Sequence, residues 1–167
     1  MAVADLQGLL RHELGDLLYA EKVFLKGLKQ MSKEASNPMM RDRIVQHAEE
    51  TQEHIINLER AFDTIGYRAR AQKCDAALGI DEERKTFRDG SPTPEVLEAF
   101  NLGAGLRAEH YEIAGYRTAI ALAEQTGSQE CARLLRRNLE QEIAMATFLE
   151  QNAPSALAQL DGVLENE

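Results

Sequence analysis

The sequence is poor in the residues that mark most non-helical folds. Its 167 residues include no tryptophan, four prolines and two cysteines, and aromatic residues make up only 5%. The strand-forming residues never cluster with the period of two that a half-buried strand requires. Three of the prolines, Pro92, Pro94 and Pro154, stand where helices would begin. These absences favour an all-α protein, and the length suits one domain, 1–167, with a proper core.

Other absences exclude classes of partner and location. No run of 18 apolar residues could span a membrane, and the N-terminus lacks the cationic start and apolar run of a secretory signal. The net charge is −9, and no basic stripe with interleaved aromatics would attract a phosphate backbone. Cys74 and Cys131 form no CxxC pair and suit reduced thiols. We therefore expect a cytoplasmic protein that binds neither nucleic acid nor membrane.

Apolar residues recur at helical spacing in long segments of the chain. The predicted helices span about 4–33, 38–65, 93–126 and 128–152, and a short tail helix spans about 154–160. Pro38 suits the first turn of the second helix, and Thr93-Pro94 suits the start of the third. Gly66 and Gly127 follow helices as typical C-terminal stops.

The connections between these helices have unequal lengths. The first two helices, and likewise the last two, are joined by a few residues and must be antiparallel neighbours. Between the pairs lie residues Tyr67 to Gly90, long enough to travel the whole bundle, with a short helix predicted from Cys74 to Glu83. Two antiparallel hairpins joined by a long crossover form a ferritin-like four-helix bundle.

Several glutamates lie on the apolar faces of these helices. At about 100° per residue, Glu21 lies within about 20° of the centre of its apolar stripe. Glu109 and Glu142 lie almost at the centres of theirs. The second helix presents His47 and His54 near its centre, with Glu50 nearer the edge.

Each of these glutamates is also close to the middle of its helix, so all four carboxylates should meet in one layer. Buried unpaired carboxylates are costly, and no lysine or arginine lies on the inner stripes. Either most are protonated or cations hold them together. Two divalent metals, iron or manganese, would balance four such charges, as in known two-metal bundles. Each glutamate could instead sit at an edge that reaches solvent.

The predicted metal ligands are five glutamates and one histidine. They are Glu21, Glu50, His54, Glu109, Glu112 and Glu142. Glu112 joins because it follows Glu109 by three residues, and His54 follows Glu50 by four, so each pair shares neighbouring turns. His54 could equally be a hydrogen-bonded core histidine. Tyr116 and His47 are candidates to support the ligands rather than to bind metal.

Three runs of residues resemble the bacterial YciF-like ferritin-like family. They are Asp16-Leu17-Leu18-Tyr19-Ala20-Glu21-Lys22, His47-Ala48-Glu49-Glu50-Thr51 and Glu109-His110-Tyr111-Glu112-Ile113-Ala114-Gly115-Tyr116. The likeness extends from about Leu9 to Leu149. It implies a cytoplasmic ferritin-like homodimer linked to stress responses, with metal ligands at Glu21, Glu50, Glu109, Glu112 and Glu142. We expect the dimer contact to include Leu78, Ile80 and Phe87 of the crossover.

The sequence departs from the family pattern at two places. His54 stands where the family usually has glutamine, and Ala146 stands where the fourth helix usually has aspartate. The leading hypothesis is a di-iron or di-manganese protein that acts on oxygen, peroxide or ferrous iron. The alternative is a non-enzymatic helical stress protein whose carboxylate layer is vestigial or structural.

Overall fold

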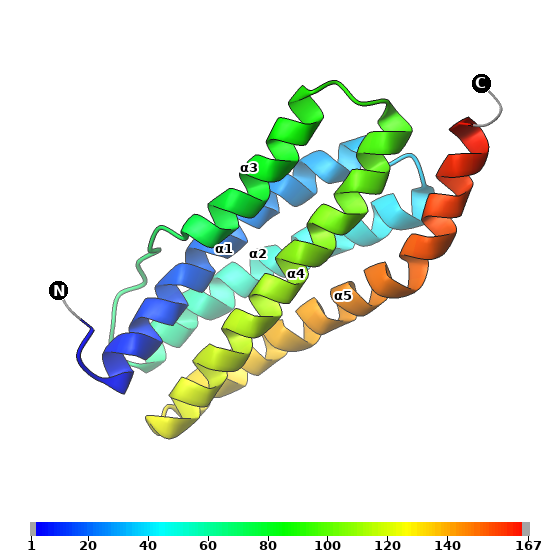
Figure 1. Cartoon of the computed structure of the whole chain (residues 1–167). Coiled ribbons are helices and arrows are strands. Elements are labelled where there is room, and N and C mark those ends of the chain that lie inside the picture. Colours follow the sequence, from blue (N-terminus) through cyan, green and yellow to red (C-terminus); the bar gives the residue numbers. More distant parts are fainter. Residues whose placement is uncertain (1–2, 165–167) are drawn as a thin grey trace.

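The computed structural model describes residues 3–164, with side-chain surroundings up to residue 159. Within that range the regular structure is entirely helical (Figure 1). The helices are α1 (Leu6–Glu34), α2 (Pro38–Thr64), α3 (Asp75–Asp89), α4 (Pro94–Gln125) and α5 (Gln129–Leu164).

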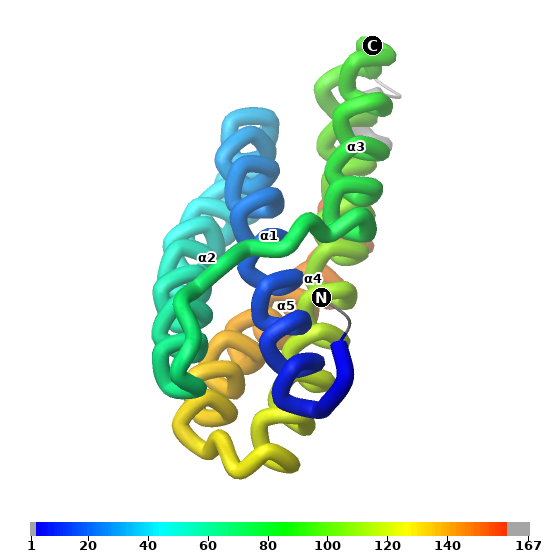
Figure 2. The backbone as a smooth tube through the Cα atoms, turned by 90° about the vertical axis from the view of Figure 1, so that its left-hand side faces the viewer, coloured from blue at the N-terminus to red at the C-terminus, as the bar shows by residue number. Residues whose placement is uncertain are grey.

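Four of these helices, α1, α2, α4 and α5, form the bundle, and α3 lies outside it. The long helix α1 packs against α2 and α4, and α5 packs against the same two helices. The helix α3 contacts only α1 and α4 among the described elements. Figure 2 shows the chain rising in α1, descending in α2, and crossing the outside of the bundle to α3 before α4 descends and α5 rises. The predicted ferritin-like fold, two antiparallel hairpins joined by a long crossover, is confirmed.

Local chemistry explains where the bundle helices begin and end. The side chain of Asn37 accepts a hydrogen bond from the amide of Met40, and Pro38 fills the first turn of α2. Thr93 caps α4 in the same way, with Pro94 in its first turn. After α4 the chain turns at Gly127, whose φ of 74° is a conformation that glycine adopts without strain.

The crossover is fastened to α1 at Gly15. The amide of Gln72 donates to the carbonyl of Gly15 at 2.8 Å. A Cβ atom at Gly15 would stand 3.0 Å from the carbonyl oxygen of Arg70, so a side chain here would push the crossover away. The helix that follows is longer than predicted, because no helix-breaking residue stands between Glu83 and Gly90.

The predicted separate tail helix, 154–160, is wrong. The last helix continues through Pro154 to Leu164 and bends in the orange-to-red stretch of Figure 1. Proline within a helix removes one amide donor and crowds the preceding turn, which bends the helix without always ending it. Asn152, whose side-chain amide donates to the carbonyl of Phe148 at 2.8 Å, satisfies one carbonyl near this bend.

Two apolar clusters fill the bundle on either side of its middle. The larger includes Leu14, Leu18, Leu58, Phe62 and Leu135. The smaller includes Leu28, Met31, Met40, Met145 and Leu149. Along α1, Glu21 follows Leu18 of the larger cluster and precedes Leu28 of the smaller one, and Leu25 of the larger cluster lies beyond it. A polar layer therefore lies where the two apolar clusters meet. Within residues 3–164, no helix has the length and apolar character to cross a bilayer.

One glutamate of α4 holds the turn between α1 and α2. Glu98 is 5% exposed, and its carboxylate accepts hydrogen bonds from the amides of Ser36 and Asn37 at 3.0 and 3.2 Å. The hydroxyl of Ser36 donates to it as well. Glu98 thus satisfies backbone donors at the start of α2 that would otherwise be unpaired.

Replacing Glu98 with alanine should lower the free energy of unfolding by about 2–3 kcal/mol, because charge-assisted hydrogen bonds to buried amides are lost. Urea unfolding followed by circular dichroism would measure the change. The matched control is Glu140→Ala on the exposed face of α5, which should change stability by less than about 0.5 kcal/mol. Equal effects of the two substitutions would contradict this role of Glu98.

Candidate metal centre

The polar layer is made of ionisable side chains from all four bundle helices. Each of them is at most 2% exposed. They are Glu21 from α1, His47 and His54 from α2, Glu109 and Glu112 from α4, and Glu142 from α5. Four buried carboxyl groups and two imidazoles in one layer cannot be left unpaired without a large desolvation cost.

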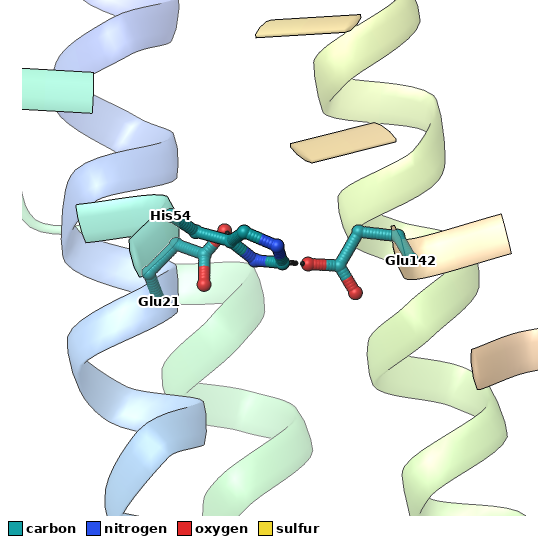
Figure 3. A group of neighbouring side chains, drawn as sticks. All are labelled: Glu21, His54 and Glu142. Atoms are coloured by element: carbon teal, nitrogen blue, oxygen red, sulfur yellow. Dashed lines mark ion pairs between the residues drawn. The ribbon is translucent and has the colours of Figure 1, made fainter. Parts of the chain in front are cut away.

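A first group joins α1, α2 and α5 (Figure 3). The Nδ1 atom of His54 lies 2.7 Å from Oε1 of Glu142 and 3.3 Å from Oε1 of Glu21. The Nε2 atom of the same ring lies 2.8 Å from the side-chain oxygen of Gln141. That contact fixes the plane of the ring, so Nδ1 faces both carboxylates.

A second group joins α2, α4 and α5 and shares Glu142 with the first. The Nε2 atom of His47 lies 3.2 Å from Oε1 of Glu109 and 3.4 Å from Oε2 of Glu142. Its Nδ1 atom lies 3.0 Å from Oε2 of Glu50. One oxygen of Glu142 thus faces each histidine, and Glu142 is the common member of both groups.

Neutral polar side chains continue the network below the first group. The hydroxyl of Tyr116 donates to Glu21. The amide of Asn138 donates to that hydroxyl at 3.0 Å and to the carbonyl of His54 at 3.2 Å. Tyr116 therefore supports a candidate ligand, as its position in the sequence predicted.

Glu50 does not enter either group. Its carboxylate accepts from Arg43 at 3.0 Å and from Gln46 at 2.8 Å, and it meets the layer only through His47. The sequence predicts Glu50 as a ligand and His47 as a supporting residue, whereas the structure places His47 in one of the two groups. The angular positions of these residues around α2 already indicated this difference, because His47 lies near the middle of the apolar stripe and Glu50 lies at its edge.

Some carboxylate oxygens of the layer have no partner. Glu21 Oε2, Glu109 Oε2 and Glu112 Oε1 are buried and accept no hydrogen bond from the described residues. Glu112 lies in the layer but outside both three-residue groups. At the place where the family pattern has aspartate, Ala146 is buried and offers no ligand atom. Both oxygens of Glu142 on α5 are likewise buried without a hydrogen bond, and they meet the histidine nitrogens only as ion pairs.

Burial and mutual contact shift the pKa values of the layer in opposite directions. Burial alone would lower the pKa of His54, but the carboxylates of Glu21 and Glu142 raise it to about 10. The pKa of His47 is raised well above its usual value by Glu109 in the same way, against its burial. Contact with the carboxylates therefore favours the protonated form of both imidazoles.

The carboxyl groups divide between the two protonation states. Burial raises the pKa of Glu109 to about 8, and burial raises the pKa of Glu112 well above its usual range. Burial acts on Glu142 too, but His47 and His54 together hold its pKa well below the usual range. In the metal-free layer, burial thus favours a proton on Glu109 and Glu112, whereas contact with the two histidines favours the ionised form of Glu142.

The layer also has the donor types of a metal site. Carboxylate oxygens and imidazole nitrogens are the usual ligands of iron, manganese and zinc. In each three-residue group, one candidate ligand atom per residue lies within 4.8 Å of the others. Binding a divalent ion would displace the protons now held by these groups, because ligands must be deprotonated. The clusters could therefore hold a metal.

Replacing Glu142 with glutamine should lower the stability of the metal-free protein by about 3 kcal/mol, because two buried histidines lose their shared counter-charge. Replacing Glu112 with glutamine should change it by less than about 1 kcal/mol, because a neutral carboxyl gives way to a neutral amide of similar size. Urea unfolding of chelator-treated protein measures both. A larger loss in Glu112→Gln than in Glu142→Gln would contradict the proton balance described above.

Comparisons with known families, curated proteins and solved structures agree on one family for this chain. Residues 5–160 match the family described as "Domain of unknown function (DUF892)". Protein YciF of Escherichia coli (strain K12) is 31% identical over 145 residues, covering 86% of this chain and 87% of that protein.

Two solved structures share the fold closely. The crystal structure of the E. coli stress protein YciF has a TM-score of 0.86 at 30% identity, covering 92% of this chain and 98% of that one. YcfI of Rhodopseudomonas palustris, described as a candidate structural protein, has a TM-score of 0.85 at 34% identity, covering 89% and 94%. The chain is a relative of YciF and belongs to the DUF892 family.

Proposed function

We propose that the polar layer is a two-metal carboxylate centre, with iron as the metal and manganese as the alternative. The observation that carries this proposal is the set of buried carboxylate oxygens without partners on Glu21, Glu109 and Glu112. A layer built only to be closed by hydrogen bonds would leave few such atoms, because each is costly. Divalent cations would satisfy them together.

Each side chain has a part in this proposal. Glu142 belongs to both three-residue groups, so it is the ligand shared between the metals. Glu21 and His54 serve one metal, and Glu109 and His47 serve the other. Glu112 completes the layer from α4. Glu50, which sequence reasoning counted as a ligand, contacts Nδ1 of His47 and orients that ring.

When bound, two such metals would offer open coordination positions and would pass electrons from ferrous iron, or from a separate donor, to peroxide or oxygen. The residues of this chain would exclude water from the layer through the apolar clusters above and below it. In the metal-bound layer, Nε2 of His47 and Nδ1 of His54, which face the carboxylates, would give up their protons to serve as ligands. The printed description of the E. coli relative as a stress protein favours a role in the stress response.

A structural role without metal is the second candidate. Contact with the carboxylates favours protonated histidines and burial favours protonated carboxyls, so protons rather than metal ions would offset the buried charge. The missing ligand at Ala146 and the structural description of the R. palustris relative point the same way. In this case the layer would fix how the helices align.

The proposal includes a cytoplasmic homodimer, as the family resemblance implies. Leu78, Ile80 and Phe87 are partly exposed on α3, and we expect them to contribute to the dimer contact. Phe87 also stacks on Phe100 of α4, with ring centroids 3.9 Å apart, so the aromatic pair is held in place within one chain. A second copy could pack on this pair.

Metal analysis of protein purified under anaerobic conditions and given ferrous iron tests the proposal. We expect two iron ions per wild-type chain and at most one in Glu109→Gln, which keeps the volume but loses an anionic ligand. The exposed Glu140→Gln on α5 is the matched control and should retain both. Wild-type protein that retains no iron or manganese would favour the structural role.

Acidity should affect the metal-free and metal-loaded proteins differently. The folded-state pKa of His54 is about 10 and that of Glu109 about 8, both above their values in an unfolded chain, so the folded state holds more protons. Stability of the metal-free protein should therefore fall as pH rises from about 7 to 10. Bound metal would replace those protons and flatten the decline. Thermal unfolding at several pH values, with and without chelator, would compare the two, and identical slopes would contradict the proposal.

A further inference from the structure

A small apolar cavity lies between the candidate metal centre and the turn that joins α1 to α2. Its volume is about 20 Å³, room for one molecule of the size of water or dioxygen. Its apolar walls include Leu28, Met31, Met40, Leu102, Met145 and Leu149. Glu109 of the polar layer lines it as well. The cavity therefore reaches a candidate metal ligand through apolar surroundings.

The polar side chains that line the apolar cavity are mostly engaged elsewhere. Glu98 accepts its hydrogen bonds from the α1–α2 turn, and the amide nitrogen of Asn101 donates to Glu34 at 3.0 Å. Among the described polar side-chain atoms of the lining, Asn101 Oδ1 and Glu109 Oε2 remain unpartnered. Both atoms can accept a hydrogen bond, so a donor such as water would find partners only at this edge of the cavity. The rest of the lining is apolar or already hydrogen-bonded and offers little to a hydrated ion.

A glycine keeps this space open. A Cβ atom added at Gly105 would stand 3.4 Å from Cδ1 of Leu149 and 3.6 Å from Cε of Met31, which are ordinary contact distances. Alanine would therefore fit inside α4 and would favour the helix more strongly than glycine does. Glycine makes this part of α4 less stable than alanine would, and it leaves the space beside Glu109 unfilled.

A second cavity on the other side of Gly105 differs in chemistry. It lies under α3, has a volume of about 30 Å³, and also reaches Glu109 and Glu112. Asp81 and Arg84 line it, and Nε of the buried Arg84 has no partner, so this space suits water or another hydrogen-bonding molecule. Because the second cavity is lined by charged groups, the apolar cavity is the more favourable route to Glu109 for an apolar molecule.

We propose that the apolar cavity is a dioxygen site that feeds the Glu109 side of the metal centre. The inference rests on the proposed two-metal function and names dioxygen as the substrate that approaches by this route. Dioxygen is apolar and diatomic, so it enters a dry apolar cavity without losing hydrogen bonds to water. It would come to rest against the Glu109 carboxylate, where the proposed centre begins.

Methionine methyl groups report on this cavity directly. Met31, Met40 and Met145 line it, whereas Met39 is 48% exposed on α2 and serves as the solvent reference. The full-length metal-free protein, labelled with ¹³C at the methionine methyls, is placed under dioxygen pressure, and the paramagnetic relaxation of each methyl is measured. We expect the three cavity methyls to relax at least about twofold faster than Met39 despite their burial, as an apolar cavity concentrates apolar molecules.

Two glycine variants in the same helix separate the cavity from general effects. Gly105→Ala should reduce the dioxygen effect at Met31 and Met145 by roughly half, because the added methyl fills the cavity. Gly103→Ala is the matched control, since its Cβ meets only the flexible end of Arg107 at 3.5 Å. Both substitutions should raise the midpoint of thermal unfolding, because alanine favours a helix more than glycine does. Only Gly105→Ala should reduce the effect of dioxygen on the cavity methyls.

Cavity methyls that relax no faster than Met39 would overturn the inference, as would an undiminished effect in Gly105→Ala. A water-filled cavity would give the first of these results. Because the experiment uses metal-free protein, it is independent of metal content. Failure here would leave a two-metal centre standing if iron binds, and absence of iron would remove the centre while the dioxygen enrichment could still be observed.

Discussion

The carboxylate of Glu142 is held between two histidines of the neighbouring helix, and the alignment of the bundle depends on that contact. One oxygen faces His54 and the other faces His47, so α5 cannot slide along α2 without leaving a buried charge unpaired. Glu21 joins α1 to His54, and Glu109 joins α4 to His47. Burial of the apolar clusters supplies most of the stability. The polar layer determines which residues lie opposite one another.

Helical periodicity was enough to find most of this layer from the sequence. Glu21, Glu109 and Glu142 were placed on inner faces near mid-helix, and all three lie buried in one layer. The angle of a residue around its helix is set by 3.6 residues per turn, so inward-facing positions follow from the apolar stripe. Glu50, at the edge of its stripe, instead meets Arg43 and Gln46 near the surface.

The sequence could not supply the charge state of the layer. It showed that no lysine or arginine lies on the inner stripes and left protonation and metal as alternatives. The answer for the metal-free chain depends on distances between side chains of different helices, such as the 2.7 Å from His54 to Glu142. Periodicity gives the direction of a side chain but not its rotamer. The angle of His47 pointed inward, but its contacts with Glu109 and Glu142 join different helices and could not be read from one helix alone.

The bend at Pro154 brings the end of α5 over the open end of the bundle. Beyond it, Ala156 is 5% exposed in the apolar cluster with Met40 and Leu149, and Gln159 accepts a hydrogen bond from Asn37 at 3.1 Å. A straight helix would carry these residues away from the α1–α2 turn. Pro154 costs α5 one backbone hydrogen bond, because proline has no amide donor. The bend that it causes lets the end of α5 cover the smaller apolar cluster.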